Sequence, residues 1–383
     1  MNILLLTFAY LPSIGGVQRC VHDLARELTR RGHRVKIVAD AEWSGVATPG
    51  RYSSEPCDVL MMRIPPPFNW EYVPKLRSIW RDACNLLRLA VLCRRSRIDV
   101  IHCHLINVDT RYGVLLKKLL GIRLVVTLHG NETSSWIAGK PHRIEYVRNI
   151  LACADAVSAL TQGQIDDALR LEPKVGGRIV RIPNPVDVAA IRAAVDQDTT
   201  LPVRPYIVYV GRFVECKSLD LLIEAYHRVL AGNPHFSADL VLVGGGELEE
   251  QLRRQARQSL GSDRIHFAGE RLWGQSLRLI EKASALVLAS HDDEGCPLVV
   301  LEAMALGTPI IVSDNPRLVE MISAGVTGQV FPRRDAVALQ ACLERIPLDN
   351  ETRVSYADAC LRRLEERHNL DHVVSECLTL YQA

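Results

Sequence analysis

The sequence lacks the long apolar runs that would place it in a membrane. None of its 383 residues lies in a stretch approaching the roughly eighteen consecutive apolar residues of a bilayer-spanning helix. Residues 1–11 are apolar, but no basic segment precedes them, and Pro12 and a glycine pair follow instead of a small-residue cleavage site. We interpret this stretch as a first strand and not as a signal peptide. We expect a cytoplasmic protein whose membrane contact would be peripheral, on the inner face.

The sequence also lacks the usual signatures of metal binding and disulfide bonding. Its 11 cysteines are odd in number and form no Cys-x-x-Cys cluster, which favours free thiols in a reducing compartment. His102 and His104 flank Cys103, but no second ligand pair follows at a suitable spacing. No Asp-x-Asp pair lies in a convincing metal-binding context. We therefore expect no metal and no cofactor.

Charge is nearly balanced over the whole chain but not along it. The formal net charge is +2, yet residues 1–187 hold 26 basic against 17 acidic side chains, and residues 188–383 hold 20 against 27. A basic first half suits an anionic membrane surface or a phosphorylated acceptor. Chance scatter of charge explains the asymmetry equally well. We expect no nucleic-acid partner.

Strand-like and helix-like segments alternate along the chain, which is typical of an α/β fold with parallel sheets. Short apolar strands are expected near residues 2–8, 35–39, 59–64, 99–104, 124–128, 156–161, 179–183, 206–211, 240–243, 265–269, 285–289 and 310–312. Amphipathic helices are expected near residues 16–31, 75–97, 221–230, 298–306, 335–347, 352–367 and 370–382. Segments 41–56 and 65–74 read as irregular loops, and 192–204 as a linker.

One stretch, residues 285–310, combines a buried strand, an acidic loop and a helix in the order that α/β enzymes use for ligand sites. Glu294 lies in the loop, and Glu302 lies about one turn into the helix. Carboxylates there can accept hydrogen bonds from sugar hydroxyls, and the helix N-terminus can face a phosphate. Taken alone, two glutamates in such positions are more often a capping residue and a surface charge.

The segment Glu294-Gly-Cys-Pro-Leu-Val-Val-Leu-Glu302-Ala-Met-Ala-Leu-Gly-Thr-Pro309 resembles the signature of retaining glycosyltransferases of family 4. The resemblance extends over most of the chain, most firmly over residues 206–332, and is absent over 41–98. It implies the GT-B architecture, with two Rossmann-like domains whose parallel sheets face each other across a cleft. An acceptor-binding domain would comprise residues 1–187 and a returning helix near 370–383. A donor-binding domain would comprise residues 188–369.

The resemblance also implies roles for individual residues in holding a nucleoside-diphosphate sugar. Arg212 and Lys217 would stabilise the leaving diphosphate, Glu294 would bind the donor sugar, and Glu302 would bind the ribose. Ser218 replaces the usual glycine after the lysine, and Asn315-Pro316 stands where two glycines are common. The further donor-binding candidates are Gly15, Gly16, Gly211, Gly245, Arg271, Gly295, Cys296, Pro297 and Leu298.

In the first half, His129 follows a strand and precedes a glycine, where the family places an active-site histidine near the transferred sugar. A histidine at a strand end is otherwise more often structural. Arg19, His104 and Asn131 are candidates for acceptor binding, and Glu132 is a further candidate. Arg19 could also be an ordinary surface charge.

Residues 75–97 read as a basic amphipathic helix that contains Trp80 and seven cationic side chains against Asp82 alone. Such a helix can lie on an anionic membrane surface. More often such a helix packs on the sheet with a solvated basic face, and both arrangements can hold together if only one edge of the helix meets lipid.

The function implied is transfer of a hexose from a nucleotide sugar to an acceptor hydroxyl with retention of configuration and without a metal. The acceptor would be a glycan or a lipid-linked molecule, as in polysaccharide, lipopolysaccharide or glycolipid synthesis. Two alternatives remain open: a nucleotide-sugar epimerase of the same fold, and a non-catalytic nucleotide-sugar sensor. The epimerase would need its own acid and base carboxylates and would need no acceptor.

Overall fold

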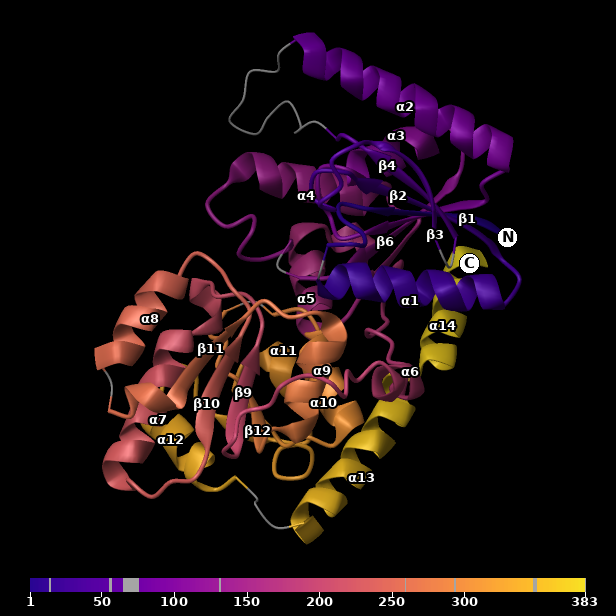
Figure 1. Ribbon diagram of the computed structural model, residues 1–383. Helices are drawn as coiled ribbons and strands as arrows, with labels where there is room; N and C mark the ends of the chain where they lie inside the picture. Colours follow the sequence, from indigo (N-terminus) through magenta and orange to yellow (C-terminus); the bar gives the residue numbers. More distant parts are fainter. Residues whose placement is uncertain are drawn as a thin grey trace. The chain divides into compact units, whose positions relative to one another are not determined.

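The computed structural model describes residues 1–13, 15–54, 57–64, 76–130, 132–258, 260–292, 294–346 and 350–382. The chain divides into two compact units. Unit 1 comprises Met1–Pro185 and Leu370–Ala383, and unit 2 comprises Val186–Asn369. Each unit has its own sheet with helices on its faces (Figure 1).

The unit 1 sheet has eight strands in the order β3-β4-β2-β1-β5-β6-β7-β8. All neighbouring pairs are parallel except β3 and β4, which are antiparallel. The strands are β1 (Asn2–Thr7), β2 (Arg34–Asp40), β3 (Gly50–Ser54), β4 (Cys57–Met62), β5 (Val100–His104), β6 (Arg123–Leu128), β7 (Ala156–Ala159) and β8 (Ile179–Arg181).

Strand β3 corrects the expectation of an irregular segment over 41–56 and of an all-parallel sheet. Its sequence, Gly-Arg-Tyr-Ser-Ser, carries no apolar alternation that would predict a strand. The strand forms because it pairs with β4 along its whole length, from Gly50 opposite Met61 to Ser54 opposite Cys57. Pairing at a sheet edge satisfies backbone groups without requiring a buried face.

Helices cover both faces of the unit 1 sheet. One core packs the sheet against α1 and α14, and the other packs it against α2, α3, α4 and α5. Helix α14 returns to unit 1 from the end of the chain, and Asp371 at its start pairs with Arg30, the last residue of α1, and with Arg31, its C-cap. The helices are α1 (Gly16–Arg30), α2 (Leu76–Ser96), α3 (Thr110–Leu120), α4 (Pro141–Cys153), α5 (Gln162–Leu171) and α14 (Leu370–Gln382), with a 3-10 turn at Pro173–Val175.

The unit 2 sheet has six strands, all parallel, in the order β11-β10-β9-β12-β13-β14. The central strands read as nearly continuous apolar runs because helices bury both of their faces. The strands are β9 (Tyr206–Val210), β10 (Asp239–Val243), β11 (Ile265–Gly269), β12 (Ala285–Leu288), β13 (Ile310–Ser313) and β14 (Gln329–Phe331).

Unit 2 begins with a helix where the sequence suggested a linker. Helix α6 (Val188–Ala193) overlaps the start of segment 192–204, and the Asp187 carboxylate caps it by accepting the N–H of Ala190 at 2.8 Å. The remaining helices are α7 (Leu219–Gly232), α8 (Glu249–Gln258), α9 (Trp273–Lys282), α10 (Leu298–Leu306), α11 (Pro316–Val319), α12 (Ala336–Glu344) and α13 (Asn350–Arg367), with 3-10 turns at Glu215–Lys217 and Ser262–Arg264.

Apart from the two outermost strands of unit 1, β3 and β8, the two sheets share one strand order, the doubly wound order 3-2-1-4-5-6. The order reverses between β1 and β5 in unit 1 and between β9 and β12 in unit 2. At such a reversal the loops leaving the two strands diverge and open a crevice at their carboxyl ends. The α/β architecture with two parallel-sheet units was correctly predicted. Among the described helices, none is both long and apolar enough to cross a bilayer.

Candidate active site

The reversal point of the unit 2 sheet brings Lys217 and Glu294 together. Lys217 lies in the loop after β9, and Glu294 lies in the loop after β12. The Lys217 ammonium forms an ion pair with Oε1 of Glu294, and the Ser290 hydroxyl donates to the same oxygen at 2.5 Å. Glu294 is only 6% exposed. A carboxylate buried to this degree requires such partners, because an unpaired buried charge costs several kcal/mol.

The Glu294 carboxylate keeps one oxygen for another partner. Both contacts fall on Oε1, and Oε2 accepts no hydrogen bond from the residues that the structure describes. The loop backbone is held separately, since the Arg317 guanidinium donates to the Glu294 carbonyl at 2.8 Å. The side chain is therefore oriented from two directions.

Ser218, which departs from the family pattern, keeps the loop geometry that a glycine would give. It adopts the left-handed conformation, with φ 49° and ψ 47°. Its hydroxyl lies 2.6 Å from the ring nitrogen Nδ1 of His291. The backbone N–H of His291 donates to the Cys216 carbonyl at 3.0 Å. These two bonds tie the Lys217 loop to the Glu294 loop, which offsets the cost of a non-glycine residue at positive φ.

Asn315, the other departure, holds the Glu294 loop from the side of β13. Its amide donates to the Asp292 carbonyl at 2.8 Å, and its side-chain oxygen caps α11 by accepting the Arg317 N–H at 3.1 Å. Sequence reasoning missed Ser290, His291 and Arg317 as supports of this site. The one local signal near this site was Asn315-Pro316, a residue pair that is typical of a helix start.

Arg212 is placed differently from Lys217, although both follow β9. Its side chain is exposed, and in the described ranges no hydrogen bond or ion pair engages its guanidinium. Its carbonyl accepts a hydrogen bond from the buried Tyr209 hydroxyl at 2.9 Å, which fixes the backbone. Within the described ranges, the loop therefore presents one cation in an ion pair, Lys217, and one outside any ion pair, Arg212.

Glycines allow two loops at this edge of the sheet to touch through their backbones. A Cβ on Gly244, where φ is +127°, would lie 2.0 Å from the Gly211 carbonyl oxygen. A Cβ on Gly246 would lie 2.6 Å from the Phe213 carbonyl oxygen. A Cβ on Gly245 would meet only side-chain atoms at ordinary distance. The sequence singled out Gly245, whereas the tight packing depends on Gly211, Gly244 and Gly246.

Helix α10 begins directly after the Glu294 loop, with Pro297 as its N-cap and no side-chain cap. Its first-turn N–H groups can therefore face a ligand. Gly295 and Cys296 lead into it, and Leu298 is its first residue. Farther along, Oε1 of Glu302 accepts a hydrogen bond at 2.7 Å from the Trp273 indole of α9, and exposed Arg271 precedes that helix.

In unit 1, the glycine pair stands at the start of α1, in the loop after β1. Gly15 is the N-cap in an extended conformation, Gly16 is the first helical residue, and both are exposed. Arg19 forms an ion pair with Asp23 one turn along, at 3.0 Å.

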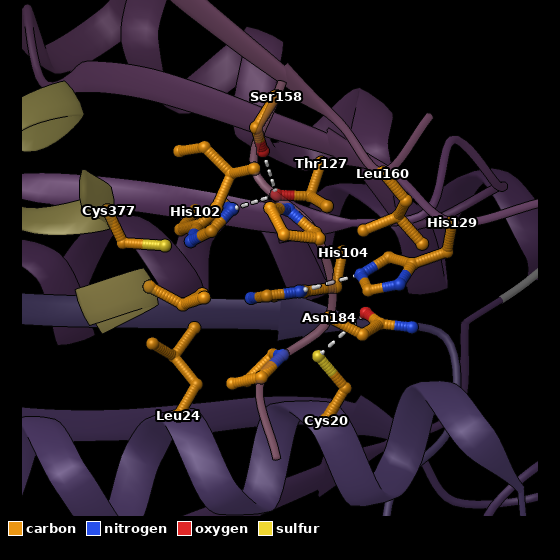
Figure 2. Close-up of a pocket in the computed structure, with 14 residues that line it drawn as sticks. Cys20, Leu24, His102, His104, Thr127, His129, Ser158, Leu160, Asn184 and Cys377 are labelled. Carbon is orange, nitrogen blue, oxygen red and sulfur yellow. Dashed lines mark hydrogen bonds between the residues drawn. The ribbon is translucent and has the colours of Figure 1, made fainter. Parts of the chain in front are cut away.

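A cluster of three buried histidines marks the reversal point of the unit 1 sheet (Figure 2). His104 ends β5 and His129 follows β6, and their Nδ1 and Nε2 atoms lie 3.0 Å apart. The His102 ring stacks 4.0 Å from that of His104 and bonds Tyr381 at 2.7 Å and Thr127 at 2.6 Å. Sequence reasoning assigned His104 and His129 to separate roles, and the structure brings the two side chains into direct contact.

Burial keeps these imidazoles neutral. It lowers the pKa of His102 to about 3 and that of His129 to about 4, and it holds the pKa of His104 well below its usual value. One ring of the His104–His129 pair must therefore donate and the other accept. Among the described residues, Nε2 of His104 has no hydrogen-bond partner.

The histidines line a small pocket between the sheet, α1, α14 and residues 182–185 (Figure 2). Its volume, about 20 Å³, is room for one water molecule and not for a sugar. Cys20 lies on its α1 side and donates to the Asn184 amide oxygen at 3.3 Å. A single water at this place could satisfy His104.

Glu132 has a structural task at the same strand end. Its two carboxylate oxygens accept the N–H groups of His129 at 2.6 Å and Gly130 at 2.7 Å. These two hydrogen bonds fix the His129 backbone. Asn131 lies outside the described residues. Within them, no group of three or more His, Cys, Asp or Glu side chains is placed to hold a metal ion.

Two family profiles match the chain, one for each unit. "Glycosyltransferase Family 4" matches residues 14–190, and "Glycosyl transferases group 1" matches residues 194–362. The chain therefore belongs to the family 4, group 1 glycosyltransferases with the GT-B fold.

Relatives of different names align with nearly the whole chain. Glycogen synthase of Mycobacterium tuberculosis is 28% identical, with 100% of this chain and 95% of the relative covered. Phosphatidyl-myo-inositol mannosyltransferase of Mycolicibacterium smegmatis is 26% identical, with 96% and 90% covered. These relatives differ in what their names say they act on, so the family assignment leaves the substrates of this chain open.

Solved structures share the fold at lower sequence identity. Sucrose-phosphate synthase from Thermosynechococcus elongatus superposes with a TM-score of 0.76 at 22% identity, covering 100% of this chain and 98% of that one. Anabaena Alr3699/HepE in complex with UDP-glucose gives a TM-score of 0.71 at 16% identity, with 99% of each chain covered.

Proposed function

We propose that this glycosyltransferase moves a hexose from a nucleoside-diphosphate sugar to an acceptor hydroxyl, with retention of configuration. The Lys217–Glu294 pair at the reversal point of unit 2 carries the proposal. A buried carboxylate with one oxygen left for a hydroxyl, beside a cation that can reach a phosphate, suits a ligand that is part sugar and part diphosphate. The UDP-glucose complex of Alr3699/HepE supports a donor of this class.

The chemical demand is charge stabilisation at the leaving group. When the bond between the anomeric carbon and the β-phosphate oxygen breaks, the diphosphate retains the electron pair and gains negative charge. Lys217, Arg212 and the α10 N-terminus would offset that charge. Losing one such preorganised contact raises the barrier by about 3 kcal/mol. Glu294 would meanwhile hold the hydroxyls of the donor sugar.

No enzymic nucleophile is assigned. The acceptor hydroxyl would attack from the face that the diphosphate leaves, and its proton would pass to the departing phosphate oxygen. Gly15 and Gly16 toward the diphosphate and Glu302 toward the ribose complete the proposal. The acceptor would be a glycan or a lipid-linked molecule.

The first test is a thermal-shift screen with UDP-, GDP- and ADP-sugars, followed by assay of nucleoside-diphosphate release. A transferase releases the diphosphate when an acceptor is added, and the anomeric proton of its product shows retention in NMR spectra. Interconversion of donor sugars without acceptor would indicate an epimerase. Donor binding with no turnover in an acceptor panel would indicate a sensor.

A second test addresses the proposal that no metal takes part. Because two cations and a helix N-terminus are available to offset the leaving-group charge, we expect EDTA to leave turnover largely unchanged. Loss of activity in EDTA that Mg²⁺ restores would contradict this part of the proposal and leave the transferase assignment standing.

A further inference from the structure

The outer face of α2 exposes apolar side chains in a continuous stripe. Trp80 is 70% exposed, Leu87 66% and Val91 40%, and Cys84 is also exposed. Their spacing of four, three and four residues places all of them on one side of the helix. Single exposed apolar residues are ordinary on protein surfaces, whereas a stripe along three helical turns calls for a partner.

The opposite side of α2 fixes this orientation. Leu89 and Cys93 are buried in the unit 1 core, and the buried Asn85 amide donates to the Arg63 carbonyl at 2.9 Å. Helix α2 contacts α3 and lies at the outside of unit 1 (Figure 1). The helix therefore has an apolar face for the core and a second, solvent-exposed apolar stripe.

Arginines flank the exposed stripe on one side. Arg81, Arg88 and Arg95 recur every seven residues, are exposed, and each follows a position on or beside the stripe. The acidic Asp82 is turned inward, where it pairs with Arg111 at 2.7 Å and accepts the Tyr112 hydroxyl. In the described part of α2 this leaves positive charge uncompensated beside apolar surface.

We propose that this surface, defined as Trp80, Cys84, Leu87 and Val91 with Arg81, Arg88 and Arg95, docks on an anionic lipid bilayer. The stripe would enter the boundary between headgroups and acyl chains, where tryptophan is favoured, and the guanidinium groups would meet lipid phosphates. Charge complementarity selects this partner. A protein partner would need acidic side chains placed beside an apolar patch to match this surface. An anionic membrane carries negative headgroups over its whole surface, next to an apolar interior.

The neighbouring helix α3 has the same character. Leu115 and Leu119 are exposed, at 38% and 59%, and Lys118 is exposed as well. The first half of the chain also carries the excess of basic residues. The inference does not depend on the donor site, because the docking surface lies on α2 and includes no donor-site residue.

The test is flotation of the full-length protein with vesicles of phosphatidylcholine alone or with about one-third phosphatidylglycerol. We expect binding only to the anionic vesicles, falling as ionic strength rises. The triple variant Arg81→Gln, Arg88→Gln, Arg95→Gln should bind on the order of a hundredfold more weakly, about fivefold for each arginine. The variant Trp80→Ser, Leu87→Ser should lose binding to a similar extent.

Matched controls come from exposed positions of unit 2. The variant Arg254→Gln, Arg257→Gln, Arg362→Gln changes the net charge equally, and Val337→Ser, Val354→Ser replaces two exposed apolar side chains with serine, as Trp80→Ser, Leu87→Ser does. Both controls should bind anionic vesicles like the wild type. Equal losses in the controls, or a wild type that ignores anionic vesicles at low salt, would overturn the proposal. So would a dimer that Trp80→Ser, Leu87→Ser dissociates without any change in vesicle binding.

Discussion

The two units place different chemistry on the same frame. Both sheets reverse their strand order at one point, yet unit 2 has the Lys217–Glu294 ion pair and exposed Arg212 there, and unit 1 has neutral histidines around a water-sized pocket. The charged side chains of unit 2 suit a ligand on which negative charge develops during the reaction. The neutral histidines of unit 1 suit hydrogen bonds to an uncharged group. Strand order sets where a site forms, whereas its chemistry depends on the residues at the strand ends.

The largest effect should come from breaking the unit 2 pair. We expect Lys217→Ala and Glu294→Ala each to lower turnover at least about a hundredfold, because each loses a contact to the donor. Lys217→Ala should also cost about 3 kcal/mol of stability, since it leaves the Glu294 carboxylate buried without its cation. Turnover assays and urea unfolding at pH 7 measure the two effects.

Two further variants separate these contributions. Lys217→Met combined with Glu294→Gln removes both charges, and we expect it to recover most of the stability and none of the activity. Arg212→Ala should reduce turnover with no change in melting temperature, because its guanidinium has no partner in the described chain. Near-normal turnover in Lys217→Ala would refute the assignment.

The glycine loops of the two units should also differ in tolerance. Gly244→Ala should destabilise unit 2 by about 3 kcal/mol, because its Cβ would overlap the Gly211 carbonyl and its φ is positive. Gly15→Ala should cost less than about 1 kcal/mol, since Gly15 is extended and its Cβ would meet only the movable end of Gln18. Gly245→Ala is the matched control, and a penalty equal to that of Gly244→Ala would contradict the packing argument.

Acid should weaken unit 1 through its histidines. Because the pKa of His129 is lowered to about 4 in the folded chain, the unfolded chain binds more protons between pH 6.5 and 4. Stability therefore falls as pH drops through that window, by about 2 kcal/mol for His129 between pH 7 and 5.

The variant His129→Gln should reduce this pH-dependent loss by about 2 kcal/mol, measured as the difference between urea unfolding at pH 7 and at pH 5. The readout is the change with pH, so a uniform loss of stability in the variant does not affect it. His235→Gln, at an exposed position of unit 2, should leave the change as it is in the wild type. If the stability of His129→Gln depends on pH as that of the wild type does, His129 is not held in its neutral form in the folded chain.

The sequence predicted those parts of the structure that depend on local pattern. Apolar runs such as Ala285–Leu288 predicted parallel strands, and the Pro297 and Gly307 boundaries predicted α10. Strand β3 escaped prediction because its partner strand and not its own sequence makes it a strand. The contacts Ser218–His291 and His104–His129 escaped because each joins residues 25 or more positions apart. No local pattern encodes a hydrogen bond across a sheet edge.

The smallest effect on catalysis should come from changing Trp273, whose indole N–H donates a hydrogen bond to Glu302 in unit 2. Trp273→Phe keeps the ring and removes the donor to Glu302. Losing one hydrogen bond to a carboxylate costs about 1–2 kcal/mol, so we expect the donor KM to rise roughly tenfold with kcat nearly unchanged. Because Glu302 is proposed to hold the ribose, a 2′-deoxyribose donor should be affected less. A fall in kcat at constant KM would instead mean that Glu302 acts in the transition state, and the proposed division of labour between Glu294 and Glu302 would be wrong.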